Sequence, residues 1–61
     1  MTPAELRAAR LALGLTQEQL ALACGYAGPN TRIMICAMEA GKRPVSARLV
    51  AMVPWLLAAK G

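Results

Sequence analysis

The sequence lacks histidine and aspartate altogether, and its only acidic residues are the three glutamates Glu5, Glu18 and Glu39. Acid–base catalysis and metal binding draw mostly on histidine and paired carboxylates, and the helix pattern gives each glutamate a structural explanation. A chain of 61 residues is also too short to enclose a deep pocket. We therefore expect no catalytic site, no metal and no cofactor.

Cysteine is scarce as well, with only two residues, Cys24 and Cys36. A zinc site needs about four cysteine or histidine ligands, and small disulfide scaffolds have more bridges than two cysteines allow. Both cysteines lie within apolar stretches, and neither has an evident base partner. We interpret them as buried free thiols in a reducing cytoplasm.

Strand-favouring residues are few, since there is no phenylalanine, one tyrosine and one tryptophan. Hydrophobic residues nevertheless make up 57% of the chain, and most of them are alanine, leucine and methionine, which favour helices. The length suffices for one domain only. The composition therefore predicts a single all-α domain over residues 1–61.

Negative charge is outweighed by seven lysines and arginines, which give a net charge of +4. A basic surplus on so small a body indicates a polyanionic partner, either nucleic acid or an anionic membrane. The basic residues are scattered among punctuated helices, which argues against a membrane-active peptide. The longest apolar run, residues 49–59, is too short to span a bilayer. Because the N-terminus also lacks a signal-peptide pattern, we expect a cytoplasmic protein.

Two capping boxes mark the starts of helices, Thr2 with Glu5 and Thr16 with Gln19. The helices that follow are expected over residues 3–13 and 17–24, each ended by a glycine. Glycine, proline and asparagine then crowd residues 25–30, which predicts a turn. The residues expected to face the core include Leu20, Ile35 and Met38.

A third helix is predicted to begin between residues 29 and 31 and to continue to Ala40. Ser46 can cap a fourth helix. Pro54 either kinks that helix or starts a separate short turn, because proline cannot donate a backbone hydrogen bond. The pattern leaves both alternatives open.

Two segments together are typical of one family: residues 10–21, RLALGLTQEQLA, and residues 35–44, ICAMEAGKRP. Over roughly residues 4–57 the chain resembles the Cro-like and phage-repressor (XRE) helix-turn-helix family. The resemblance implies a small lambda-repressor-like bundle of about four to five helices, whose helix-turn-helix binds double-stranded DNA. It also implies a repressor, often of its own operon in a phage, mobile element or toxin–antitoxin system.

The start of the second helix provides the first expected DNA contacts, Thr16 and Gln17. A helix N-terminus favours a phosphate through its backbone amides and its dipole. In the family, a glutamine matching Gln17 touches the DNA backbone. The alternative is that Gln17 is a solvated residue within the capping box.

The match makes the third helix the recognition helix, and its groove-facing start comprises Asn30, Thr31, Arg32 and Ile33. Arg32 suits bidentate reading of guanine O6 and N7, and Ile33 suits a thymine methyl group. Arg32 could instead contact a phosphate or stay solvated. Asn30 and Thr31 have the alternatives of capping the helix or contacting phosphate.

Lys42 and Arg43 directly follow the third helix. They are expected to contact backbone phosphates, which positions a protein on DNA without reading its sequence. Charges at this place also favour the negative end of the helix dipole. The two interpretations are compatible.

The family also pairs an arginine of the first helix with a glutamate at the end of the third. Arg10 and Glu39 stand at the matching positions, so the resemblance predicts a partly buried ion pair between them. This pair would be structural. Removing one partner would leave a poorly compensated charge, at a cost of about 3 kcal/mol.

The region of the third helix departs from the family pattern. The span 25–35 is longer than the usual turn, and Tyr26 could either cover the edge of the core or contact the DNA backbone. Residues 33–38 are unusually apolar, so Met34 and Cys36 either pack deeply or contact a protein. The alternative function is therefore a helix-turn-helix fold that binds a partner regulator or toxin.

The C-terminal segment has more apolar side chains than one edge of so small a core needs. The residues expected to form the interface of a two-fold homodimer are Val53, Trp55, Leu56 and Leu57. Such a dimer would present two recognition helices about 34 Å apart, or a multiple of that distance, to a palindromic operator. The alternative is that these residues complete the core of a monomer.

Overall fold

A computed structural model describes residues 1–60, which form four α-helices and no strand. The helices are α1 (Pro3–Leu13), α2 (Gln17–Ala23), α3 (Thr31–Glu39) and α4 (Ala47–Lys60). This confirms the expected all-α class. None of the helices in this part of the chain combines the length and the apolar character needed to cross a bilayer.

The two predicted capping boxes fix where α1 and α2 begin. The backbone N–H of Glu5 donates to Oγ1 of Thr2 at 3.1 Å, and the N–H of Thr2 donates to the Glu5 carboxylate at 2.8 Å. Thr16 and Gln19 repeat this arrangement at 3.1 and 2.9 Å. Each box therefore satisfies backbone donors that the first turn of a helix leaves without an intrahelical partner.

The ends of the helices lie close to the predicted positions. Gly14 ends α1 with a φ of 71°, a left-handed conformation that residues with a Cβ rarely adopt. α2 ends at Ala23, one residue earlier than expected, and α3 ends at Glu39, also one residue earlier. The local signals of glycine and threonine thus locate the first three helices well.

α4 is one continuous helix through Pro54 to Lys60, so no separate turn begins at the proline. Oγ of Ser46 accepts a hydrogen bond from the N–H of Leu49 at 3.3 Å, which confirms Ser46 as the cap. Pro54 is exposed, so its ring lies away from the core and leaves the packing of α4 undisturbed.

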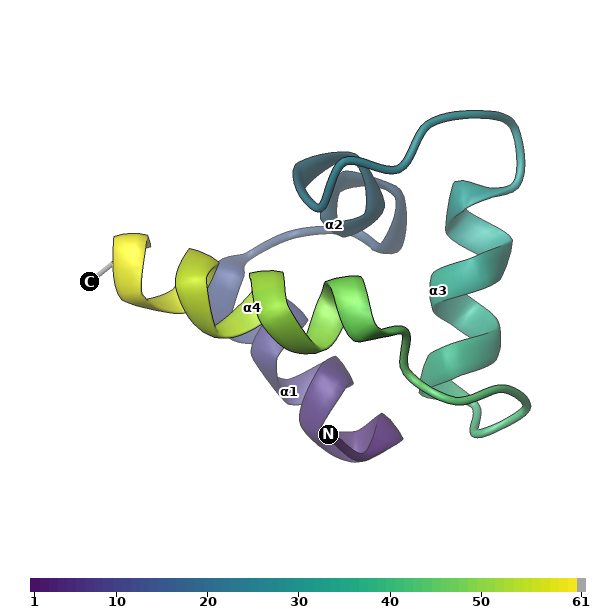
Figure 1. The fold of residues 1–61 in the computed structure, drawn as a ribbon, viewed down its shortest axis with the longest axis horizontal. Helices are drawn as coiled ribbons and strands as arrows, with labels where there is room; N and C mark the ends of the chain where they lie inside the picture. The colour runs from purple at the N-terminus through teal and green to yellow at the C-terminus, as the bar shows by residue number, and fades with distance from the viewer. Residues whose placement is uncertain (61) are drawn as a thin grey trace.

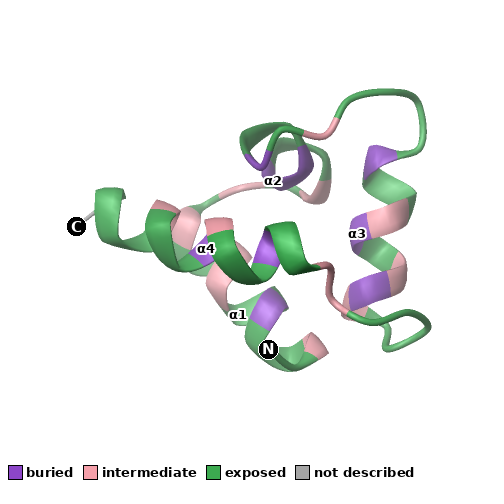
Figure 2. Cartoon of the chain, viewed as in Figure 1, coloured by how far each residue is buried: buried purple, intermediate pink, exposed green. Residues whose placement is uncertain are grey.

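All four helices contribute side chains to one core (Figure 2). α2 packs most extensively against α3, whereas α4 packs chiefly against α1. The small side chain of Ala21 is buried and lets neighbouring elements approach closely. The largest fully buried side chains, which include the three expected ones, are Leu6, Leu20, Ile35, Met38, Leu49 and Val53.

The burial of Val53 and Cys36 differs from the predictions. Val53 was expected at a dimer interface, but it is fully buried. Because it lies four residues after Leu49, it shares the core-facing side of α4. Cys36 was expected inside, but it is exposed, whereas Cys24 is buried. Cys36 follows Ile35 directly, and a rotation of about 100° per residue turns it away from the core.

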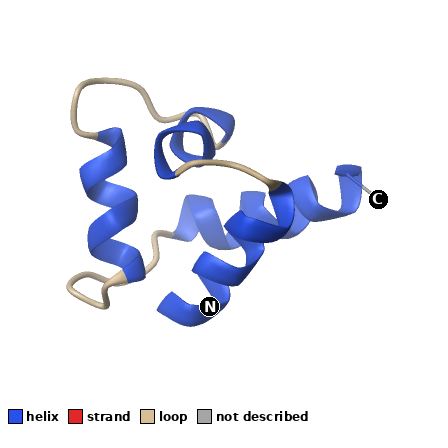
Figure 3. Cartoon of the chain, turned by 180° about the vertical axis from the view of Figure 1, so that it is seen from behind, coloured by secondary structure: helices blue, strands red, loops and turns tan. Residues whose placement is uncertain are grey.

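α3 stands at one end of the molecule, and the C-terminal end of α4 lies at the other (Figure 1). The view from behind shows α3 between two loops, residues 24–30 from α2 and residues 40–46 to α4 (Figure 3). α2 and α1 are the helices that pack against α3. The opposite side of α3 is therefore a surface of the molecule.

Candidate nucleic-acid interface

α3 has a buried face and an exposed face. Thr31, Ile35 and Met38 point into the core and are 7%, 0% and 1% exposed. Arg32 and Ile33 lie on the exposed side, where Ile33 keeps 60% of its surface accessible. The first turn of α3 therefore offers these two side chains to a partner.

The four residues expected to face the groove lie in different environments. The prediction for Thr31 is wrong, because Thr31 lies four residues before Ile35, on the same face, and is buried. Asn30 occupies the N-cap position, but its side chain makes no capping hydrogen bond. Asn30 is also exposed, so its amide remains available for another contact.

The exposed side of α3 rises between two hollows. Ile33 and Ala37 line both hollows, so these two residues form a ridge between them, the α3 ridge. Arg32 and Lys42 line the hollow on one side, which measures about 260 Å³. Two cations therefore line this hollow.

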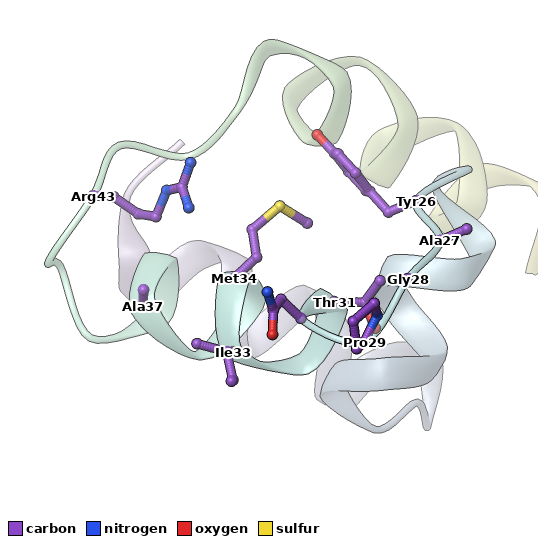
Figure 4. A pocket seen from close by; sticks show the side chains of 10 residues that line it. Tyr26, Ala27, Gly28, Pro29, Thr31, Ile33, Met34, Ala37 and Arg43 are labelled. Carbon is purple, nitrogen blue, oxygen red and sulfur yellow. The ribbon is translucent and has the colours of Figure 1, made fainter.

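The hollow on the other side of the ridge is larger, about 630 Å³, and is called the trough here. Loop 26–30, Met34 and Arg43 line it together with the ridge. Figure 4 shows the side chains of Met34 and Arg43 pointing into the trough, with Tyr26 on its far side. The α3 ridge thus has basic side chains on both flanks.

These basic side chains have no acidic partner in residues 1–60. The one ion pair there joins Arg10 to Glu39. Arg32, Lys42 and Arg43 are exposed, so their charges face solvent around α3. Positive charge therefore gathers on the side of α3 that faces away from α1 and α2.

The predicted Arg10–Glu39 pair is confirmed. Nε of Arg10 donates to Oε2 of Glu39 at 2.6 Å, and Nη2 donates to Oε1 at 3.2 Å. Nη1 of Arg10 also donates to the carbonyl of Leu15 at 3.0 Å. The two side chains are only 13% and 6% exposed, so the pair ties α1 to the end of α3 in a largely water-free place.

Sequence reasoning missed a third member of this network, Gln17. Its Nε2 donates to Oε1 of Glu39 at 3.4 Å, which draws its amide toward α3. Thr16 is exposed, and its Oγ1 accepts the Gln19 N–H within the capping box. An amide has two N–H donors, so Gln17 keeps one for a further partner.

Loop 24–30 is anchored to the start of α4. The hydroxyls of Tyr26 and Ser46 share a hydrogen bond at 2.7 Å. The Arg48 guanidinium lies 5.0 Å from the centre of the Tyr26 ring and donates to the carbonyl of Gly25 at 3.3 Å. Gly28 has a φ of 115°, which an L side chain rarely adopts. These contacts hold the wall of the trough in place.

Tyr26 is half-buried and packs against the core. This confirms the interpretation that it covers the edge of the core. Met34 likewise packs partly against the core, whereas Cys36 on the same helix does not. The unusually apolar stretch of α3 therefore contains residues that pack against the core and residues that are exposed.

The remaining residues expected at a dimer interface differ in exposure. Trp55 is 63% exposed and Leu57 is 36% exposed, whereas Leu56 is half-buried against the core. Val50, which sequence reasoning missed, is 44% exposed. Val50 and Leu57 are seven residues apart with Pro54 between them, a spacing that puts all three along one side of α4.

No three cysteine or glutamate side chains within residues 1–60 gather closely enough to hold a metal ion. Comparison with protein-family models, with curated proteins and with solved structures finds no match for this chain. The function proposed below therefore rests on the chain's own residues and on the surface that they form around α3.

Proposed function

We propose that the chain is a sequence-specific regulator of transcription that binds double-stranded DNA. In this proposal α2, loop 24–30 and α3 form a helix-turn-helix of the XRE kind, and α3 enters the major groove with the α3 ridge foremost. The observation that supports it best is the arrangement of unpaired basic side chains on both flanks of this exposed ridge.

The major groove suits this shape. It is about 12 Å wide, and phosphates border it on both sides. A helix that enters it needs a slim leading edge and cations on each flank. Arg32 and Lys42 lie on one flank and Arg43 lies on the other. Glu39, the only carboxylate of α3, is paired with Arg10, so it does not repel the phosphates.

The side chains around the ridge suggest how sequence would be read. Arg32 would contact guanine O6 and N7, while Ile33 and Ala37 would meet thymine methyl groups. Lys42 and Arg43 would contact phosphates and position the protein. The operator would therefore be read largely through methyl groups, with Arg32 as the main hydrogen-bonding residue.

The start of α2 would add a phosphate contact. Gln17 is half-buried, and one of its amide N–H groups is directed at Glu39. Its second N–H would reach the DNA backbone beside Thr16. This contact would link the phosphate to Glu39 and, through it, to Arg10.

α4 would join two copies in a homodimer, because residues 49–59 contain no charged side chain. Trp55 and Leu57 are the exposed members of the expected interface, but they project from different sides of α4. Trp55, with the accessible edge of Leu56, would form the main contact. A two-fold dimer would bind a palindromic operator. We further propose that it acts as a repressor in the cytoplasm, on its own operon in a phage, mobile element or toxin–antitoxin system.

The DNA proposal is tested by selecting binding sites from random duplex DNA and measuring affinity against salt concentration. Several simultaneous phosphate contacts predict a steep linear fall of log K with log salt. Lys42→Gln should reduce that slope by about one while leaving sequence preference intact. Lys60→Gln removes the same charge at the far end of α4, so it is the matched control and should leave the slope unchanged.

Arg32→Ala should instead relax the preference at one base position, because Arg32 is the proposed guanine reader. Equal losses over all sequences for Arg32→Ala and Lys42→Gln would contradict that assignment. Failure to enrich any site, or equal effects of Lys42→Gln and Lys60→Gln, would contradict the DNA proposal as a whole.

A second candidate function follows from the exposed Ile33, since a side chain 60% exposed on an apolar ridge also suits a protein partner. In that case the chain would bind a regulator or toxin through the α3 ridge. Ile33→Ala would then abolish binding, and the affinity would depend little on salt. The salt slope therefore distinguishes the two candidates.

The homodimer has a built-in probe, because Trp55 is the only tryptophan. Burial in an interface should shift its fluorescence to shorter wavelength as protein concentration rises. Trp55→Glu should give a monomer in analytical ultracentrifugation. A wild-type chain that stays monomeric at high concentration, with no shift in fluorescence, would contradict the dimer.

A further inference from the structure

The trough beside α3 has walls from three parts of the chain. Loop 26–30 forms one wall, the side of α3 bearing Met34 forms the floor, and Arg43 closes the remaining side. Figure 4 shows Met34 and Arg43 converging on the same space, which Tyr26 faces from the opposite wall. The hydrogen bond between Tyr26 and Ser46 and the contact with Arg48 hold that wall in position.

The residues that line the trough differ in charge and polarity. Among residues 1–60, Arg43 is the only charged residue that lines the trough, and none of the carboxylates of this part of the chain lines it. Arg43 has no ion-pair partner within residues 1–60. Most of the lining around it is apolar, with the thioether of Met34 and the ring of Tyr26 as the largest groups, while Asn30 and Thr31 add neutral polar groups. An occupant should therefore have one negative charge on an apolar body.

We infer that the trough binds a small aryl carboxylate. The planar fork of Arg43 matches a carboxylate in bidentate fashion. A flat ring suits the rest of the trough, because the sulfur of Met34 and the ring of Tyr26 both contact aromatic groups favourably. A volume of about 630 Å³ lies within the range of small-molecule sites.

Binding at the trough would be coupled to DNA binding, and this part of the inference rests on the proposed function. Arg43 cannot bind a carboxylate and a phosphate at full strength at once. An aryl carboxylate would therefore lower the affinity for DNA, and DNA would lower the affinity for the carboxylate by the same factor. The trough would act as the effector site of the regulator.

The test uses the full chain with ¹³C-labelled methionine methyl groups and phenylacetate as the probe, followed by NMR. The Met34 methyl resonance should shift in a saturable way, whereas that of Met52 on α4 should not. Phenylacetamide, which has the same shape without the charge, should bind at least about tenfold more weakly, because charge-assisted hydrogen bonds are lost. Arg43→Gln should weaken phenylacetate binding to a similar extent.

Arg32→Gln is the matched control, because Arg32 lies on the other side of the α3 ridge, and it should leave phenylacetate affinity unchanged. The inference is overturned if Met34 shows no saturable shift, if phenylacetamide binds as well as phenylacetate, or if both arginine variants bind equally weakly. Phenylacetate binding in a chain that binds no DNA would overturn only the proposed function. Phenylacetate binding that leaves DNA affinity unchanged would overturn only the coupling.

Discussion

α3 and α4 both present apolar side chains to solvent, but the charges around them differ. The α3 ridge has Arg32 and Lys42 on one flank and Arg43 on the other. The exposed part of α4 has no charged residue between Arg48 and Lys60. α3 is also tied at its end by a partly buried ion pair, whereas α4 is held mainly by apolar packing on α1.

This difference separates two kinds of partner. An apolar surface between uncompensated cations suits a polyanion that also has apolar groups, as the major groove has in its thymine methyls. An apolar surface without charge suits another apolar surface, and a second copy of the chain provides one. Under the proposal, the two helices would account for two different properties of the regulator, α3 for DNA reading and α4 for dimerisation.

The largest expected effect comes from removing the anchor of α3. Glu39→Gln should lower the free energy of unfolding by about 3 kcal/mol, because it leaves the Arg10 guanidinium largely buried without its counter-charge. Thermal or urea unfolding measures this loss. Glu18→Gln removes an exposed carboxylate and should change stability by less than about 0.5 kcal/mol. Equal effects of the two variants would mean that the anchor contributes little.

A smaller effect on stability is expected from substitutions that compare the buried and exposed sides of α4. Val53→Ala should destabilise the chain by about 2 kcal/mol, because Val53 is fully buried. Trp55→Ala should leave the unfolding of the monomer almost unchanged and weaken self-association instead. Urea unfolding at low concentration, combined with sedimentation, checks both. A dimer that survives Trp55→Ala would contradict the role of Trp55 at the interface.

Cys24 and Cys36 allow a buried thiol to be compared with an exposed thiol on α3. Burial raises the pKa of the Cys24 thiol above its ordinary value of 9.0. The contribution of this thiol to stability is therefore full below that value and is lost as pH rises through the raised pKa of the folded state. Unfolding of Cys24→Ala should depend less on alkaline pH than unfolding of the wild type. Cys36→Ala is the control and should keep the wild-type dependence.

The smallest expected effect is at the start of α1, the helix on which α4 packs. Hydrogen bonds from Thr2 hold the pKa of Glu5 below its ordinary value of 4.5. Stability from this carboxylate is present above that value and is lost as pH falls through the lowered pKa. Glu5→Gln should flatten the acid side of the stability profile slightly. An unchanged profile would indicate that the capping box has no measurable charge dependence.

Much of the fold could be predicted from local signals. Capping boxes at Thr2 and Thr16 act within a few residues, so they locate helix starts without knowledge of the tertiary structure. Ile35 and Met38 follow from helical spacing. The Arg10–Glu39 pair followed from the family resemblance, and the structure confirms it.

Other features could not be predicted, for physical reasons. Residues 49–59 contain no polar side chain, so periodicity could not show that Val53 faces inward and Trp55 outward. Residues 33–38 of α3 are also apolar, so periodicity could not show that Cys36 faces solvent. The contacts of Tyr26 with Ser46 and of Gln17 with Glu39 join residues 20 and 22 positions apart. They depend on how the helices pack, which no local pattern specifies.

The proposed binding of DNA to the exposed side of α3 can be tested most directly with the thiol of Cys36. Cys36 is exposed beside the α3 ridge, and Cys24 is buried, so alkylation followed by mass spectrometry reports on the two positions separately. We predict that saturating operator DNA slows alkylation of Cys36 severalfold, that high salt restores the rate, and that Cys24 stays unreactive. Unchanged alkylation of Cys36 in a chain fully bound to DNA would contradict the claim that this face of α3 binds the duplex.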